Sequence, residues 1–110
     1  MDMERDRGEP LYFISIAARL VEVHPQTLRM YEREGLLQPA RVNRLRLYSE
    51  RDIERVRHIQ SYTRIGVNLQ GVKMILDLLD KWERARQELE QMESEIERLR
   101  AQSARGLAGR

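Results

Sequence analysis

The chain has no cysteine, only three prolines, and aromatic residues at 5% of its 110 positions. Without cysteine, these residues cannot form a disulfide, a cysteine zinc site or a thiol redox centre. The two histidines, His24 and His58, lack a paired metal-ligand spacing, so we expect no metal and no cofactor. No apolar run approaches the length of a membrane span and no signal-peptide pattern is present, which predicts a cytoplasmic protein without membrane contact.

Enzyme chemistry is also poorly supported. The sequence offers no nucleophile–base pairing, carboxylate cluster or phosphate-binding loop, so we expect that the protein is not an enzyme.

The basic residues of the chain are almost all arginine, with lysine only at Lys73 and Lys81. The planar guanidinium suits phosphates and guanine edges, although a GC-rich genome or a heat-tolerant host would give the same bias. Residues 24–64 carry nine arginines against five acidic residues, a net +4, whereas residues 80–100 carry five basic against seven acidic, a net −2.

Two short helices are predicted near the N-terminus, after a polar arm over residues 1–10 that we expect to be flexible. Apolar spacing predicts a helix over residues 15–22, capped by Ser15. After a break at Glu22-Val23, Pro25 opens a second helix that runs to Glu34 and ends at Gly35. Two helices joined by a short turn indicate a helix-turn-helix, whose second helix enters the major groove of DNA.

The outward side of this second helix carries residues that can read DNA. Gln26, Arg29, Met30 and Arg33 fall on one side, and glutamine and arginine pair bidentately with adenine and guanine. Met30 could instead fill the core, and Tyr31 could pack inward or offer its hydroxyl to a phosphate. The candidate DNA contacts from this helix are Gln26, Thr27, Arg29, Met30, Tyr31 and Arg33.

A small hairpin is predicted next. Leu45 and Leu47 alternate with Arg46 and Tyr48, a period of two that is typical of a strand. We expect a two-stranded wing with its turn at Asn43-Arg44, although the missing glycine leaves the turn type open. Tyr48 could contact a phosphate or be purely structural. The candidate wing contacts are Arg41, Asn43, Arg44, Arg46 and Tyr48.

The C-terminal part carries a heptad pattern. Before it, Ser49 and Asp52 resemble a capping box that opens a helix with Ile53, Val56 and Ile59 on its inner face, and Asn68 caps the next helix. Four unbroken heptads follow, which predicts a coiled coil with a second copy of the chain as the simplest partner. The predicted interface residues are Ile75, Leu78, Trp82, Ala85, Leu89, Met92, Ile96 and Leu99.

The predicted architecture is therefore mainly α. A winged helix-turn-helix head over residues 11–74 has a small two-stranded wing, a dimerisation coiled-coil helix covers residues 75–102, and residues 103–110 form a disordered tail. Whether residues 68–102 form one unbroken helix stays open from the sequence.

Three segments in this order, together more than half the chain, resemble the MerR family of bacterial transcription regulators: ISIAARLVEVHPQTLRMYEREGLLQPAR, RLYSERDIERVRHIQ and GVNLQGVKMILDL. The resemblance implies a homodimer, paired through antiparallel 75–99 helices, that binds an inverted repeat in double-stranded DNA. Residues 24–29 and 66–72 are similar to the heat-shock repressor (HspR) branch. That branch implies a repressor of chaperone genes with the DnaK chaperone as co-repressor. Metal-sensing relatives carry cysteines that this sequence lacks.

Other functions stay open at this stage. The same family includes ligand-responsive activators that distort promoter DNA, and the sequence does not separate repression from activation. An adaptor that only uses the coiled coil is disfavoured by the arginine-rich wing. An architectural protein that bends DNA is disfavoured by the four heptads. The operator, the effector and the regulated genes are not predicted.

Overall fold

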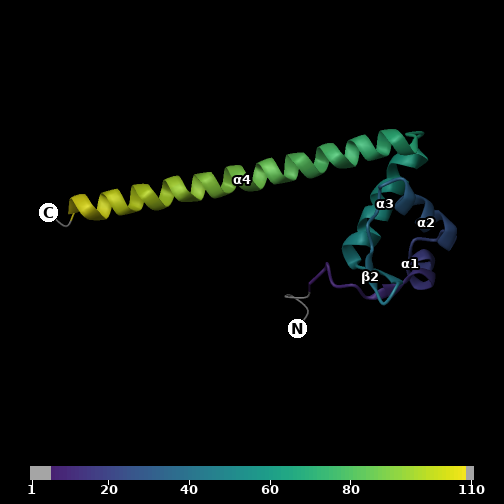
Figure 1. The fold of residues 1–110 in the computed structure, drawn as a ribbon. Helices are drawn as coiled ribbons and strands as arrows, with labels where there is room; N and C mark the ends of the chain where they lie inside the picture. Colours follow the sequence, from purple (N-terminus) through teal and green to yellow (C-terminus); the bar gives the residue numbers. More distant parts are fainter. Residues whose placement is uncertain (1–5, 109–110) are drawn as a thin grey trace. The chain divides into compact units, whose positions relative to one another are not determined.

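The computed structural model describes residues 6–108, and it divides into two units, Met1–Met74 and Ile75–Arg110. Its elements are β1 (Tyr12–Phe13), α1 (Ile14–Leu20), α2 (Pro25–Arg33), β2 (Ala40–Val42), β3 (Leu45–Tyr48), α3 (Glu50–Arg64) and α4 (Leu69–Ala108) (Figure 1). Helices dominate and the strands are short, which confirms the predicted mainly α class. None of the helices within residues 6–108 has the length and apolar character needed to span a membrane.

The small sheet has three antiparallel strands in the order β1-β3-β2. The predicted hairpin of β2 and β3 is confirmed, with Arg41 opposite Arg46 and Val42 opposite Leu45. Strand β1 adds a third strand through the pairs Tyr12 with Tyr48 and Phe13 with Leu47, which the prediction of a two-stranded wing missed. Two residues are too few to show a period of two, and the pairing joins segments far apart in the sequence.

Helices α1 and α2 form the predicted helix-turn-helix. Strand β1 leads directly into α1, whose N-cap is the extended Phe13 without a side-chain cap, so the predicted Ser15 cap is wrong. At the other end of α1, Glu22 takes a positive φ of 57° and the Val23 amide donates to the Ala18 carbonyl at 3.0 Å. This is the hydrogen-bond pattern of a Schellman motif, and it turns the chain sharply toward α2.

Helix α2 is fixed at both ends by local chemistry. The His24 Nδ1 accepts a hydrogen bond from the Gln26 amide at 3.0 Å, so His24 is the N-cap and Pro25 stands first in the helix. At the C-terminal end Gly35 has a φ of 77°, as predicted, and the Leu36 amide donates to the Tyr31 carbonyl at 2.9 Å. These caps set where α2 begins and ends on the surface.

The core of the first unit lies between the helices and the sheet. Its buried apolar side chains include those of three segments: Leu28 of α2, Leu36 and Leu37 of the following loop, and Val56 and Ile59 of α3. Each such side chain contributes about 1.5–3 kcal/mol through burial. Two hydrogen bonds tie α3 to the helix-turn-helix: Gln60 Nε2 donates to the Val21 carbonyl at 2.8 Å, and Arg55 Nε donates to the Leu36 carbonyl at 2.6 Å. The helix-turn-helix is thereby held on α3 by apolar and polar contacts.

Helix α3 begins with the predicted capping box. The Ser49 hydroxyl accepts from the Asp52 amide at 3.1 Å, and an Asp52 carboxylate oxygen accepts from the Ser49 amide at 2.9 Å. Helix α4 is capped as predicted by Asn68, whose Oδ1 accepts from the Gly71 amide at 2.8 Å. Helix α4 then continues to Ala108 without a break.

Both predicted chain ends need correction. Residues 103–108 are helical, because no proline follows and the single Gly106 does not end α4; residues 109–110 lie outside the described part. Residues 6–10 form a hydrogen-bonded turn bound to α3, not a free arm. The Arg51 amide donates to the Arg7 carbonyl at 3.1 Å, and Arg7 pairs with Glu54. The rest of the predicted arm, residues 1–5, is outside the described residues.

Candidate nucleic-acid interface

The outward side of α2 presents the polar residues that the sequence predicted. Gln26 and Arg33 are exposed, and Thr27, Arg29 and Met30 are half-buried. Leu28 and Tyr31 lie on the opposite, buried side. Arg29 Nη1 donates to Gln26 Oε1 at 3.0 Å, so the two side chains best suited to base recognition are linked. This side of α2 can therefore offer both donors and acceptors to a base edge.

Two predicted contacts lie in the core instead. Tyr31 is 6% exposed and Tyr48 is 0% exposed. Burial raises the pKa of both phenols. The Tyr48 hydroxyl has no hydrogen-bond partner among residues 6–108 and, since it has no exposed surface, a phosphate cannot reach it. Tyr48 therefore cannot contact DNA in this structure, so its prediction as a contact is wrong, and Tyr31 is a core residue.

The burial of Tyr48 follows from which face of the hairpin packs inward. Arg46 and Tyr48 lie on the same face of β3, and the side chain is half-buried at Arg46 and buried at Tyr48. Leu45, on the other face, is 53% exposed. Burial rises along β3, from the exposed Leu45 through the half-buried Arg46 and Leu47 to the buried Tyr48, so the predicted alternation does not appear as one buried and one exposed face. Period-two patterning shows that two faces differ without showing which one packs against the helices.

The wing turn is built without glycine. Asn43 and Arg44 have φ values of 51° and 70°. Two central residues with positive φ define a type I′ turn, the turn that matches the twist of a two-residue hairpin. Asparagine tolerates this conformation, but arginine at such a φ costs roughly 1–2 kcal/mol. Both residues are exposed at the tip of the wing, where Arg44 can meet a phosphate.

An acidic residue of α2 connects the two strand arginines of the wing. Arg41 Nη2 donates to Glu32 Oε1 at 2.8 Å, and Arg46 Nε donates to Glu32 Oε2 at 2.5 Å. Burial alone would raise the pKa of Glu32, but the hydrogen bonds and charges of Arg46 and Arg41 outweigh it, and the pKa is lowered. Glu32 is a residue of this site that the sequence does not predict, because in the sequence it is only one acidic charge among several. The contact joins residues 9 and 14 positions apart, and no local pattern indicates it.

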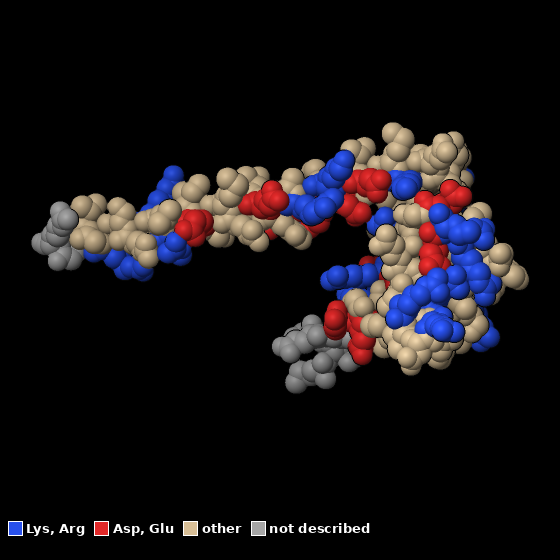
Figure 2. Space-filling model, in the orientation of Figure 1, with Lys and Arg blue, Asp and Glu red and all other residues tan. Residues whose placement is uncertain are grey.

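Positive charge gathers around these elements. Figure 2 shows lysine and arginine side chains grouped on the first unit, whereas acidic and basic patches alternate along α4. In the part of the chain that the structure describes, no group of three His, Cys, Asp or Glu side chains is placed to hold a metal ion.

A helix-turn-helix followed by a β-hairpin wing defines a winged helix-turn-helix, a class of DNA-binding fold. The sequence profile of the MerR HTH family regulatory proteins matches residues 12–79. The chain belongs to this family of regulatory proteins.

Individual relatives agree with this assignment. The heat-shock protein HspR of Streptomyces coelicolor is 48% identical over 77 residues, which cover 68% of this chain and 51% of that protein. The regulator MlrA of Escherichia coli is 41% identical over 68 residues, 60% of this chain and 28% of MlrA. This chain thus spans about half or less of the length of these relatives.

The fold is similar to two solved structures. The regulator PbrR691 of Ralstonia metallidurans CH34, in complex with lead(II), has a TM-score of 0.62 at 29% identity and covers 83% of this chain and 79% of its own. HiNmlR, a MerR family regulator lacking the sensor domain and bound to promoter DNA, has a TM-score of 0.58 at 22% identity, covering 79% and 76%. The second likeness concerns the fold alone.

Proposed function

We propose that the chain is a dimeric transcription regulator that binds an inverted repeat and represses heat-shock genes. The observation that carries this proposal is the 48% identity to HspR over 77 residues. The family assignment and the arginine-rich wing support DNA binding, and the resemblance to the heat-shock repressor branch supports the choice of genes.

In the proposed complex, α2 enters the major groove. Gln26, Arg29 and Arg33 would meet base edges or flanking phosphates, with Thr27 and Met30 beside them. Arg41, Arg44 and Arg46 of the wing, with Asn43, bind the backbone next to the groove. Phosphate contacts supply affinity and salt dependence, whereas base contacts supply sequence choice.

The dimer is proposed to form through the apolar side of α4 in the second unit. Exposed there are Leu78 (63%), Trp82 (62%), Leu89, Met92, Ile96 and Leu99, all at a or d positions of the heptads. Ile75 is half-buried and Ala85 is exposed. Such a stripe is costly in water, and pairing two copies would bury it. Two heads related by a two-fold axis would match the two halves of an inverted repeat.

The first test is binding to a duplex that carries the inverted repeat of a chaperone-gene promoter, against a scrambled duplex, at two salt concentrations, with and without the DnaK chaperone. The proposal predicts roughly thousandfold selectivity or more. It also predicts that DnaK strengthens the complex. Equal, steeply salt-dependent binding to both duplexes would contradict the heat-shock assignment.

The alternative is a ligand-responsive activator that distorts promoter DNA. It is favoured by the relatives named for metals, such as the mercuric resistance operon regulatory protein of Pseudomonas fluorescens, 36% identical over 69 residues. These 110 residues contain no cysteine, so no thiolate is available here to a soft metal. Transcription in vitro separates the two functions, because a repressor lowers promoter output and an activator raises it when its ligand is added.

A further inference from the structure

The wing places two positive charges directly opposite each other. Arg41 of β2 and Arg46 of β3 are a register pair, so their side chains leave the hairpin on the same face. Like charges at such a position destabilise a sheet. The Glu32 carboxylate lies between them and accepts one hydrogen bond from each guanidinium, at 2.8 Å and 2.5 Å. The arginine pair is therefore balanced by a residue of a different element, helix α2.

The environment makes this contact more than a surface ion pair. The side chain of Glu32 is 21% exposed and that of Arg46 is 26% exposed, so water screens the pair only partly. Arg41, at 49%, is more open to solvent. A guanidinium has five N–H donors, and the contact with Glu32 uses one, so others can bind a phosphate. Glu32 thus orients both guanidinium groups while they keep donors for DNA.

We infer that Glu32 is the specificity-determining residue that couples α2 to the wing. This inference rests on the proposed DNA-binding function and assigns one acidic side chain a role within it. Glu32 holds the wing arginines in a fixed register to the helix that reads bases. The negative charge of Glu32 also offsets part of the attraction between these arginines and any phosphate. Indiscriminate backbone binding is weakened, and binding in which α2 and the wing fit together is favoured.

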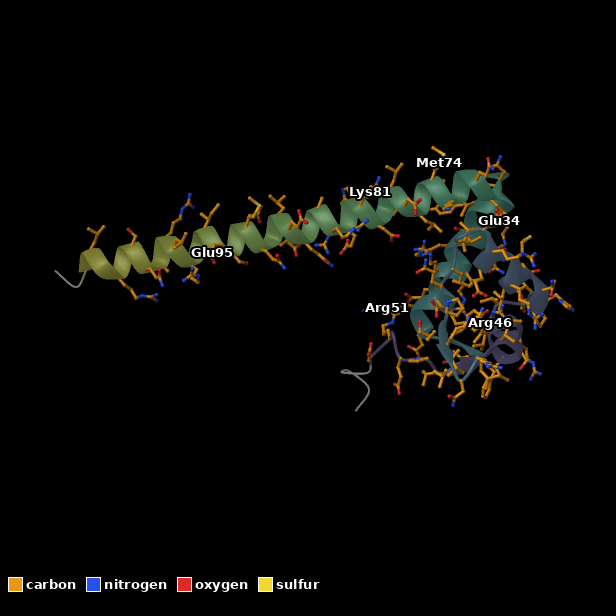
Figure 3. All side chains as sticks on the ribbon, in the orientation of Figure 1. Glu34, Arg46, Arg51, Met74, Lys81 and Glu95 are labelled. Carbon is orange, nitrogen blue, oxygen red and sulfur yellow. The ribbon has the colours of Figure 1, made fainter. Side chains whose placement is uncertain are left out.

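The matched pair of variants is E32Q and E34Q. Both remove one negative charge from the same stretch of chain, but Glu34 is exposed at the C-cap of α2. Figure 3 shows the Glu34 side chain well apart from that of Arg46. A difference between the two variants therefore reports the contact with the arginines and not the net charge.

Two duplex probes are used: one enriched by the wild-type chain from a random-sequence pool, and the unselected pool itself. For E32Q we expect stronger binding to the unselected pool, with a salt dependence steeper by up to roughly 0.9 per chain, because the positive charge that Glu32 neutralises becomes available to a phosphate. The ratio of selected to unselected affinity should fall roughly fivefold to tenfold, which lies within the range of coupling between residues in contact. E34Q should keep the wild-type ratio.

A third variant covers the case in which E32Q fails to fold, which circular dichroism would show. E32D keeps the charge but is one methylene too short to reach both arginines, so the ratio should fall while the salt dependence stays near that of the wild type. If E32Q or E32D binds like E34Q, the inference is overturned. It is also overturned if E32Q binds both probes more weakly with a shallower salt dependence, which indicates a merely structural role. If the wild-type chain enriches no duplex, the proposed function itself fails.

Discussion

The strained tip of the wing gives a prediction in which stability and binding change in opposite directions. Arg44 has a φ of 70° in a type I′ turn, where glycine is the favoured residue. Replacing Arg44 by glycine removes the clash of the Cβ atom with the backbone, and it also removes the charge at the tip. We expect R44G to fold more stably and to bind DNA less tightly.

The magnitude follows from two opposing terms. Relief of the left-handed conformation is worth roughly 1–2 kcal/mol. Glycine gives back about 0.5–1 kcal/mol, because it increases the entropy of the unfolded chain. The free energy of unfolding should therefore rise by up to about 1.5 kcal/mol, with the middle of the range at ~0.75 kcal/mol. If Arg44 neutralises one phosphate, the salt dependence of DNA binding becomes shallower by roughly 0.9 per chain.

Urea unfolding and DNA binding across a salt series measure the two effects. The controls are R44K, which keeps the charge and the strain, and R44N, which removes the charge but tolerates a positive φ. R44K should match the wild type in both assays, and R44N should lose the same part of the salt dependence as R44G. A lower stability of R44G than of the wild type would contradict the strain at Arg44, and equal salt dependence of R44G and R44K would contradict its contact with a phosphate.

Four further predictions use the same measurements. Y48F removes a buried hydroxyl that has no hydrogen-bond partner among the described residues. Urea unfolding should therefore show a free energy of unfolding higher by about 1 kcal/mol, and DNA affinity should be unchanged. A loss of affinity would indicate that Tyr48 contacts DNA after all. S49A breaks the capping box of α3 and should cost about 1 kcal/mol in a thermal melt, whereas an unchanged melting temperature would mean that the cap does not hold the helix. E32Q should be less stable than the wild type by about 1–2 kcal/mol at neutral pH. Since the folded-state pKa of Glu32 is lowered, its stabilisation is present above the ordinary value of 4.5 and is lost as the pH falls through the lowered pKa. Urea unfolding at neutral and acidic pH should therefore show that the difference in unfolding free energy between the wild type and E32Q shrinks at acidic pH. A constant difference would contradict this cause. L89D places a charge on the apolar side of α4, and sedimentation equilibrium should show the dimer dissociating at concentrations where the wild type stays associated.

Local chemistry in the sequence was sufficient to predict most of the first unit. The Pro25 start of α2, the Gly35 end and the Ser49–Asp52 capping box each depend on residues within one helical turn, and each is confirmed. The hairpin was predicted because alternation and the Asn43-Arg44 turn are also local. The same reasoning was wrong at Ser15, where a good capping residue follows a strand that runs straight into the helix.

Tertiary contacts set the limit of the sequence prediction for the site. Nothing near Tyr48 in the sequence indicates that β1 pairs beside it and that its face of the hairpin is buried. Likewise, Glu32 joins the site only because α2 lies beside the hairpin. The exposed residues Gln26, Arg33 and Arg44 were predicted as candidates because helical and hairpin geometry alone put them outward. Their contacts with DNA stay predictions.

Two copies of this chain are proposed to read one inverted repeat. The most direct measurement titrates the wild-type chain, at concentrations well above the dissociation constant, into the duplex it enriches from a random pool, with a scrambled duplex in parallel. We expect saturation at two chains per duplex, a symmetric footprint, and an affinity roughly a thousandfold or more above that for the scrambled duplex. Equal affinity for both duplexes, or saturation at one chain without a symmetric footprint, would contradict it.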